Sequence, residues 1–223
     1  NITAYTFRID DRDTRDYIAA RAACAMFGWS FVSCDVPSAN LENDFPVLAE
    51  EFLCKKKTQF ECTWPFLYVF PLVQERVVVF GVTADIHYGL SKSAMIHHVH
   101  SKQAFDAYRY KRFGEANPSG VRQLRMLSDR YNKILSTPYM DAEVFDYFIQ
   151  FDWREINKPQ QKYLVVSDFA EHFRKFGVRR HASAQLVAKV PMYFERLLGT
   201  ALNIKERKRV MDMCRDWGKR YAA

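Results

Sequence analysis

The pattern of hydrophobic and polar residues predicts strands and helices in the first part of the chain. Residues Ile2–Ile9 and Trp29–Val36 have the β-branched and aromatic content of strands. Between them, apolar residues at helical spacing predict a helix that begins after the capping residues Asp10 and Asp13 and ends at Gly28. The order strand, helix, strand predicts a parallel pair joined by a right-handed crossover.

The next apolar segments continue this alternation. Residues Phe45–Cys54 read as a helix, and Phe60–Val73 is the most apolar segment of the chain. Because Pro65 and Pro71 interrupt this segment, it predicts either a kinked buried helix or two short helices. The run Val77–Phe80 is apolar at every position, which is typical of a buried parallel strand.

No strand is predicted beyond Ser91. Helices are expected instead, at Ser93–Arg112, Val121–Leu135, Ala142–Ile149, Val166–Phe176, Ala184–Leu198 and Ile204–Tyr221. The predicted fold class is therefore α/β, with a parallel Rossmann-like sheet in an α/β nucleotide-binding half at 1–92 and an all-helical half at 93–223. The two halves together are predicted to form one domain.

Composition narrows the class of protein. The 223 residues are 48% hydrophobic and 26% charged, a composition that is typical of globular proteins. No apolar run of about 18 residues and no charged-then-apolar leader is found, so we expect no membrane contact and a cytoplasmic location. The five cysteines form no C-x-x-C pair, which predicts reduced thiols and no zinc site.

The net charge of +7 suits a polyanionic partner such as ATP or a nucleic acid. Much of this charge lies in the predicted helix at 204–221, between Lys205 and Arg220. A solvated helix face explains such a cluster as well as nucleic-acid binding does.

The candidate chemistry lies in the loop that follows the strand at Val77–Phe80. The loop runs from Gly81 to Gly89, contains Asp85, and leads to Ser91, a candidate N-cap. In open α/β sheets, ligands bind beyond the carboxyl ends of the strands, and a loop entering a helix suits phosphate. A carboxylate at that place can hold the Mg²⁺ that accompanies phosphates.

Residues 81–89, GVTADIHYG, resemble the G-x-G-x-D-E-x-x-G loop of the asparagine synthetase family, whose synthetase domain is an ATP pyrophosphatase of the PP-loop class. Three more segments resemble family features in the same order: the helix Ala19–Gly28, which follows an extended segment at Tyr5–Ile9, then Pro138–Asp141, and Lys162–Val165. The resemblance covers nearly all of the chain and implies the PP-loop version of the α/β fold.

The resemblance implies roles for individual residues. Asp85 would lie beside Mg²⁺ and pyrophosphate, and its alternative role is that of a turn residue capping backbone N–H groups. Lys162 would stabilise charge on the phosphate or the acyl-adenylate, and its alternative is an exposed helix lysine. The remaining positions implied for nucleotide contact are Gly81, Thr83, Phe7 and Arg8.

The sequence departs from the family in two places. The phosphate-gripping motif S-G-G-x-D-S does not occur, which predicts that a central strand, lying between those at Ile2–Ile9 and Arg76–Phe80, comes from a preceding segment or a partner chain. Ile86 replaces the glutamate that acts as general base in the family, and isoleucine accepts no proton. His87 is a candidate replacement base, with a satisfied loop histidine as the alternative.

The function predicted from this resemblance is an ATP- and Mg²⁺-dependent adenylating ligase that releases AMP and pyrophosphate. Its other substrate would be a small carboxylic acid or amine, with an acceptor other than ammonia alone. Two alternatives stay open at this point. One is a PP-loop enzyme that modifies tRNA and uses the basic carboxyl-terminal helix, and the other is a catalytically inert relative that serves as a binding or assembly subunit.

Overall fold

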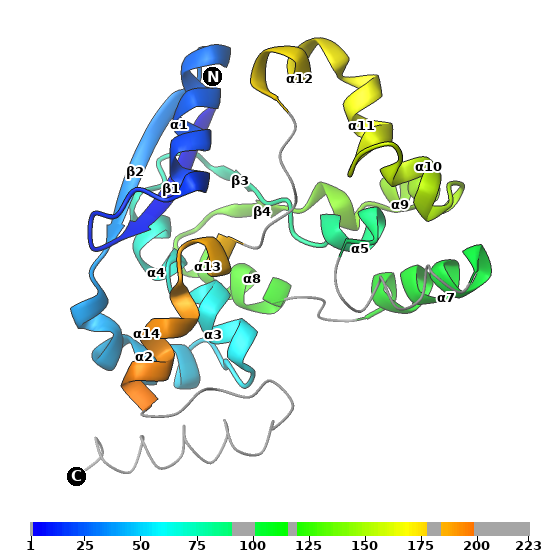
Figure 1. The fold of residues 1–223 in the computed structure, drawn as a ribbon. Coiled ribbons are helices and arrows are strands. Elements are labelled where there is room, and N and C mark those ends of the chain that lie inside the picture. Colours follow the sequence, from blue (N-terminus) through cyan, green and yellow to red (C-terminus); the bar gives the residue numbers. More distant parts are fainter. Residues whose placement is uncertain (1, 91–100, 116–119, 178–183, 199–223) are drawn as a thin grey trace. The chain divides into compact units, whose positions relative to one another are not determined.

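The computed structural model describes residues 2–90, 101–115, 120–177 and 184–198 (Figure 1). These residues form two compact units. The first unit consists of the described residues within 1–76, 122–134 and 182–223, and the second of those within 77–121 and 135–181. Each unit is thus assembled from separated segments of the chain, whereas the predicted halves at 1–92 and 93–223 follow sequence order.

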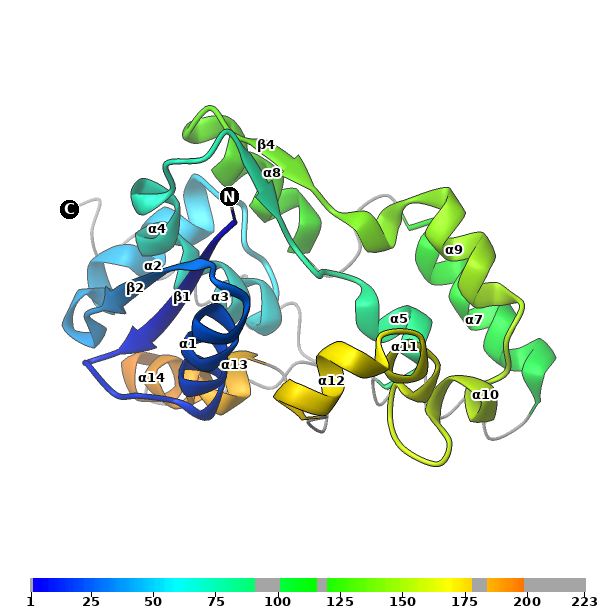
Figure 2. The same ribbon diagram turned by 90° about the horizontal axis from the view of Figure 1, so that it is seen from above.

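The first unit contains the predicted β-α-β arrangement. Strands β1 (Thr3–Ile9) and β2 (Ser30–Val36) pair in parallel, in register from Thr3 opposite Ser30 to Ile9 opposite Val36. Helix α1 (Arg15–Phe27) joins them and packs against both strands (Figure 2). This confirms the prediction of a parallel pair with a helical connection.

The ends of α1 are set by local chemistry. Gly28 ends the helix in the left-handed region, at φ 67°, as a glycine at this position does most easily. The N-cap is Thr14, whose side chain accepts a hydrogen bond from the backbone N–H of Tyr17 at 3.1 Å. The predicted caps Asp10 and Asp13 are therefore wrong, because Thr14 stands directly before the first helical residue and satisfies the N–H group itself.

Short helices and an aromatic core complete the first unit. The elements are the 3₁₀ turns Ser38–Asn40 and Phe70–Leu72 and the helices α2 (Leu41–Glu50), α3 (Lys57–Thr63), α4 (Phe66–Val69), α8 (Val121–Arg130), α13 (Ala184–Val187) and α14 (Val190–Leu198). The rings of Phe45 and Phe60 stack at 4.7 Å, and Phe194 packs against both. The segment with two prolines forms separate short helices, one of the two predicted outcomes.

A second pair of strands was not predicted. Strands β3 (Val77–Val79) and β4 (Ile134–Ser136) form a two-stranded sheet. Ile134 N–H donates to the Arg76 carbonyl, and Phe80 N–H donates to the Ser136 carbonyl, so residue numbers rise together and the pair is parallel. The expectation of no strand beyond Ser91 is wrong, because a three-residue strand is too short to show a periodicity of its own.

The strand β3 is also more exposed than predicted. Val77 is 50% and Val79 65% exposed, although the apolar run suggested burial on both faces. Within the described residues β3 pairs with β4 alone, and β1 pairs with β2 alone. The α/β class is confirmed, while one continuous Rossmann-like sheet with a further central strand stays a prediction.

The second unit is otherwise helical. Its elements are α5 (Ala84–Tyr88), α7 (Lys102–Phe113), the 3₁₀ turn Pro138–Met140, α9 (Ala142–Ile149), α10 (Trp153–Asn157), α11 (Tyr163–Asp168) and α12 (Ala170–Phe176). Helix α9 has the predicted bounds, and the carboxylate of Asp141 caps it by accepting from Glu143 N–H at 2.9 Å. The core of the unit is formed by Ile86, Tyr88, Phe105, Tyr108, Phe148 and Ile156.

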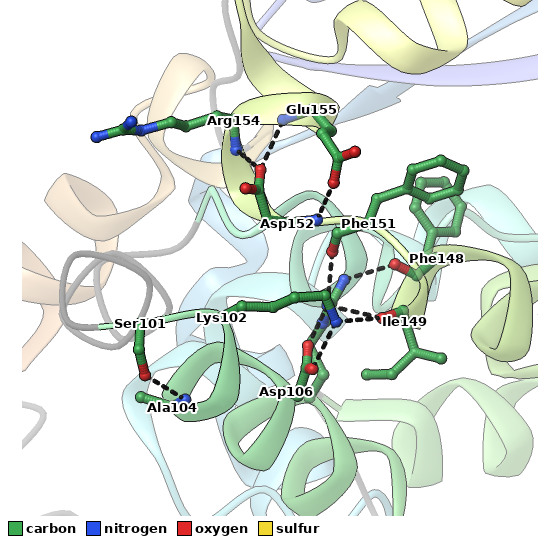
Figure 3. Close-up of polar contacts among 11 residues, drawn as sticks. Ser101, Lys102, Ala104, Asp106, Phe148, Ile149, Phe151, Asp152, Arg154 and Glu155 are labelled. Carbon is green, nitrogen blue, oxygen red and sulfur yellow. Dashed lines mark hydrogen bonds and ion pairs between the residues drawn. The ribbon is translucent and has the colours of Figure 1, made fainter.

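A fully buried arginine joins α7 to the end of α9. The guanidinium of Arg109 donates to the carbonyls of Phe148 at 2.7 Å and Phe151 at 2.9 Å, and it forms an ion pair with Asp106. Lys102 reaches the same carboxylate and the Ile149 carbonyl (Figure 3). These donors satisfy carbonyl groups that a helix end leaves without intrahelical partners.

Some predictions lie outside the described residues: those for Ser91, for the first part of the helix expected at 93–112, and for the basic helix at 204–221. In the part of the chain that the structure describes, no helix is long and apolar enough to cross a membrane. Cys24, Cys34, Cys54 and Cys62 are free thiols, as predicted for them.

Candidate functional site

The loop after β3 turns directly into the short helix α5. Gly81 is exposed, and a side chain placed there would meet nothing within 4 Å. Thr83 follows in the left-handed region, at φ 73°, with its side chain buried and its hydroxyl oxygen without a hydrogen-bond partner. A non-glycine residue in this conformation is uncommon and marks a backbone held by its surroundings.

Asp85 lies in the first turn of α5 and is half-buried. The helix is fixed by its neighbours, because Ile86 and Tyr88 belong to the core of the second unit. Gly89 ends it at φ 63°, where an added Cβ would lie 2.7 Å from the rings of Phe105 and Trp153, so glycine alone fits. The carboxylate of Asp85 is thus presented from a rigid support.

A carboxylate oxygen is a ligand that Mg²⁺ prefers, so the chemistry of Asp85 fits the implied metal. The described residues contain no group of three or more His, Cys, Asp or Glu side chains arranged to hold a metal ion.

His87 points into the core. It is 1% exposed, and its Nε2 lies 2.6 Å from the Tyr139 carbonyl oxygen, so Nε2–H donates, while the neutral Nδ1 finds no partner among the residues that the structure describes. Burial lowers the pKa of this imidazole, and a weaker effect of the hydrogen bond to Tyr139 opposes it. The geometry favours the satisfied loop histidine over the replacement base, because the ring does not face solvent.

Lys162 is held at the start of α11 in the left-handed region, at φ 62°. Its backbone N–H donates to Asn157 Oδ1 at 3.0 Å, and Asn157 Nδ2 donates to the Tyr88 carbonyl at 2.8 Å. The ammonium of Lys162 lies 5.3 Å from the centre of the Tyr88 ring. One asparagine and one tyrosine therefore tie Lys162 to α5, the helix that carries Asp85.

The ammonium of Lys162 has no carboxylate partner within the described part of the chain. Its side chain is half-buried, and among the described residues no carboxylate lies within 4 Å of its Nζ. Burial lowers the pKa of Lys162. A partly desolvated cation without a counter-charge favours an anionic ligand, because the ligand would offset the cost of desolvation.

Phe7 and Arg8 belong to the first unit, on β1. Arg8 is occupied by carboxylates, at 2.6 Å from Asp35, 3.1 Å from Asp11 and 3.2 Å from Asp13. Hydrogen bonding to Asp35 is the main reason that the pKa of Arg8 is raised. Gly81, Thr83, Asp85 and Lys162 all belong to the second unit, where Lys162 contacts α5 through Asn157 and Tyr88. A nucleotide contact that includes Phe7 and Arg8 stays a prediction.

The sequence did not single out Tyr88 or Asn157, the two residues that connect Lys162 with α5. Asn157 is buried and lies 69 positions from its partner Tyr88. No local pattern signals such a contact, because both residues resemble ordinary members of a loop and a short helix.

No protein-family model matches this sequence, and no curated protein matches it either.

Proposed function

We propose that this chain is an ATP- and Mg²⁺-dependent adenylating ligase of the asparagine synthetase-like class, which forms AMP and pyrophosphate. The observation that supports this most directly is the half-buried ammonium of Lys162, without a carboxylate within 4 Å in the described residues, on a segment bonded to α5. An ammonium so placed suits a phosphate group as a point charge.

Lys162 and Asp85 would have different roles in the adenylation step. A carboxylic acid oxygen attacks the α-phosphorus of ATP, and pyrophosphate leaves with the bonding electron pair. Lys162 would stabilise the negative charge that develops on the phosphate oxygens, an effect that typically contributes about 10²- to 10³-fold in rate per donor. Asp85 would hold Mg²⁺, which neutralises phosphate charge when it is bound.

The burial of Ile86 leaves no proton-accepting side chain at the position where the asparagine synthetase family has its general base. Ile86 is 3% exposed and packs in the core, so the position of the family's general base is occupied by an apolar side chain that faces away from solvent. An acceptor that reaches this enzyme must therefore lose its proton to another group, or arrive already as a free amine.

The test is pyrophosphate release from ATP and Mg²⁺ across a panel of small acids and amines. It uses the protein at its full encoded length, so that any segment preceding residue 1 is present. Asp85→Asn should lower release at least about 100-fold, because the amide is a poor Mg²⁺ ligand. The matched control is Asp146→Asn, an exposed carboxylate on α9, which should leave release unchanged.

Equal release by the Asp85→Asn variant and the wild type would remove Asp85 from the mechanism. Absence of release by the wild-type protein with every acid and amine would contradict the ligase and favour a binding or assembly subunit.

A further inference from the structure

An aromatic groove lies within the second unit, where α9 and α11 meet the end of α5. Its cavity volume is about 600 Å³, within the range of roughly 300 to 1,000 Å³ that small-molecule sites occupy. Five of its lining residues are aromatic: Tyr88, Tyr139, Tyr147, Phe148 and Phe169. We call this cavity the aromatic groove.

The rings stand at steep angles to one another. Tyr88 and Phe148 lie 5.3 Å apart with an interplanar angle of 80°, and Tyr147 and Phe148 lie 5.4 Å apart at 86°. Tyr88 and Phe148 are each 4% exposed, whereas Tyr147 is 41% and Phe169 55% exposed, so these last two rings are the ones that a ligand would mainly reach. The faces of aromatic rings attract organic cations, such as ammonium groups, through their negative quadrupole.

Although the ammonium of Lys162 lies 5.3 Å from the centre of the Tyr88 ring, the charged residues that line the groove itself are both acidic. Glu143 and Asp168 are lining residues, and none of the described residues that line it is Lys, Arg or His. The hydroxyl of Tyr147 donates to Asp168 at 3.1 Å and so helps to orient that carboxylate. In a chain of net charge +7, a lining with two carboxylates and five aromatic rings selects against anions.

We propose that the aromatic groove binds a small organic ammonium ion with an apolar body, such as an arylalkylamine. The apolar body of the ligand would pack against the aromatic rings. Its ammonium would lie over the face of a ring and pair with Glu143 and Asp168. Tyr88 forms part of the groove and also contacts the ammonium of Lys162, so the groove adjoins the candidate site.

As the acceptor substrate of the proposed ligase, the bound ammonium would first give a proton to Glu143 or Asp168; its nitrogen would then attack the acyl carbonyl of the adenylate, and AMP would leave. This assignment rests on the proposed ligase function, whereas binding itself does not.

The test is calorimetric titration of the full-length protein with three probes of matched length, without nucleotide: 2-phenylethylamine, neutral 2-phenylethanol and anionic 3-phenylpropanoate. The amine should bind most tightly and the acid least. Asp168→Asn and Glu143→Gln should each weaken amine binding about two- to fivefold, as expected for exposed ion pairs, and should leave alcohol binding unchanged.

The matched control is Glu171→Gln, which removes an exposed carboxylate from α12, outside the groove, and should not alter amine binding. Phe169→Ala should weaken both the amine and the alcohol, because the ring is a lining residue. Since Phe169 is 55% exposed, this variant is expected to fold.

Equal binding of the amine and the alcohol, tighter binding of the acid, or absence of binding would overturn the proposal. Pyrophosphate release without amine binding would reject the groove and leave the ligase intact. Amine binding without pyrophosphate release would support the groove and contradict the ligase.

Discussion

The second unit contains two desolvated cations that differ in how they are satisfied. Arg109 is fully buried, and its guanidinium meets carbonyl oxygens and the carboxylate of Asp106. Lys162 is half-buried and meets a tyrosine ring, with no carboxylate within 4 Å among the described residues. Of the guanidinium nitrogens of Arg109, only Nε finds no acceptor among the described residues. A cation paired with a carboxylate and carbonyl oxygens holds a fold together, whereas one without a counter-charge is suited to a ligand.

The largest effect on stability is expected from the replacement of Arg109. The Phe148 carbonyl keeps the N–H of Phe151 as a donor when the guanidinium is removed. Arg109→Met should nevertheless lower the free energy of unfolding by about 3 kcal/mol, because the Phe151 carbonyl loses the guanidinium donor and Asp106 loses its buried partner. Urea denaturation measures this change. Lys111→Met, at an exposed position on the same helix, is the control and should change stability by less than about 0.5 kcal/mol.

A loss below about 1 kcal/mol for Arg109→Met would show that the carbonyls find other donors. It would also mean that the hydrogen bonds and ion pair of the buried Arg109 contribute little to stability. Arg109 would then no longer differ from Lys162 in its structural role.

His87 is intermediate between Arg109 and Lys162 in how its polar groups are satisfied. One ring nitrogen is hydrogen-bonded, and the other has no partner among the described residues. Burial lowers its pKa below the ordinary value near 6.5, so the unfolded chain gains a proton at a higher pH than the folded protein does. Stability from the neutral ring is therefore complete above pH 6.5 and is lost as the pH falls from there toward the lowered pKa.

The measurement is urea denaturation of the wild type and of His87→Gln between pH 7.5 and 5.5. The variant should lose less stability than the wild type as the pH falls, by up to about 1.4 kcal/mol per pH unit of pKa shift. His172→Gln, at an exposed position on α12, should follow the wild type. Parallel curves for the wild type and His87→Gln would contradict a lowered pKa at His87.

The smallest effect on stability is expected at Lys162. Lys162→Met should leave the free energy of unfolding at pH 7 unchanged or raise it by up to about 1 kcal/mol, because the variant buries no charge. Urea denaturation at pH 7 tests this. A loss of more than about 1 kcal/mol would instead assign Lys162 a structural role like that of Arg109.

The sequence predicted those parts of the fold that depend on local chemistry. Helix α9 begins directly after its cap Asp141, and α1 ends at Gly28, so both boundaries were visible in the residues themselves. Strand β4 was missed because three residues, Ile134–Ser136, carry no periodicity and acquire their conformation from pairing with β3. The burial of β3 was overestimated for the same reason, since the faces of a strand are covered by distant segments.

The sequence likewise predicted some parts of the candidate site and missed others. Asp85 was identified from the spacing of a short loop, and the resemblance pointed to Lys162. The contacts that join Lys162 to α5, through Asn157 and Tyr88, connect residues far apart in the chain and have no local signature. The orientation of His87 into the core was equally invisible, because a histidine in a loop can face either solvent or core.

The measurement that tests the central claim most directly is the rate of pyrophosphate release by Lys162→Met, compared with Lys158→Met. Both lysines lie near an aromatic ring, Lys158 at 6.0 Å from the centre of Trp153 and Lys162 at 5.3 Å from that of Tyr88, but Lys158 is exposed whereas Lys162 is half-buried. If the ammonium of Lys162 stabilises the departing pyrophosphate, Lys162→Met should lower the rate about 100-fold and Lys158→Met should leave it unchanged. Equal rates for the two variants would contradict the account.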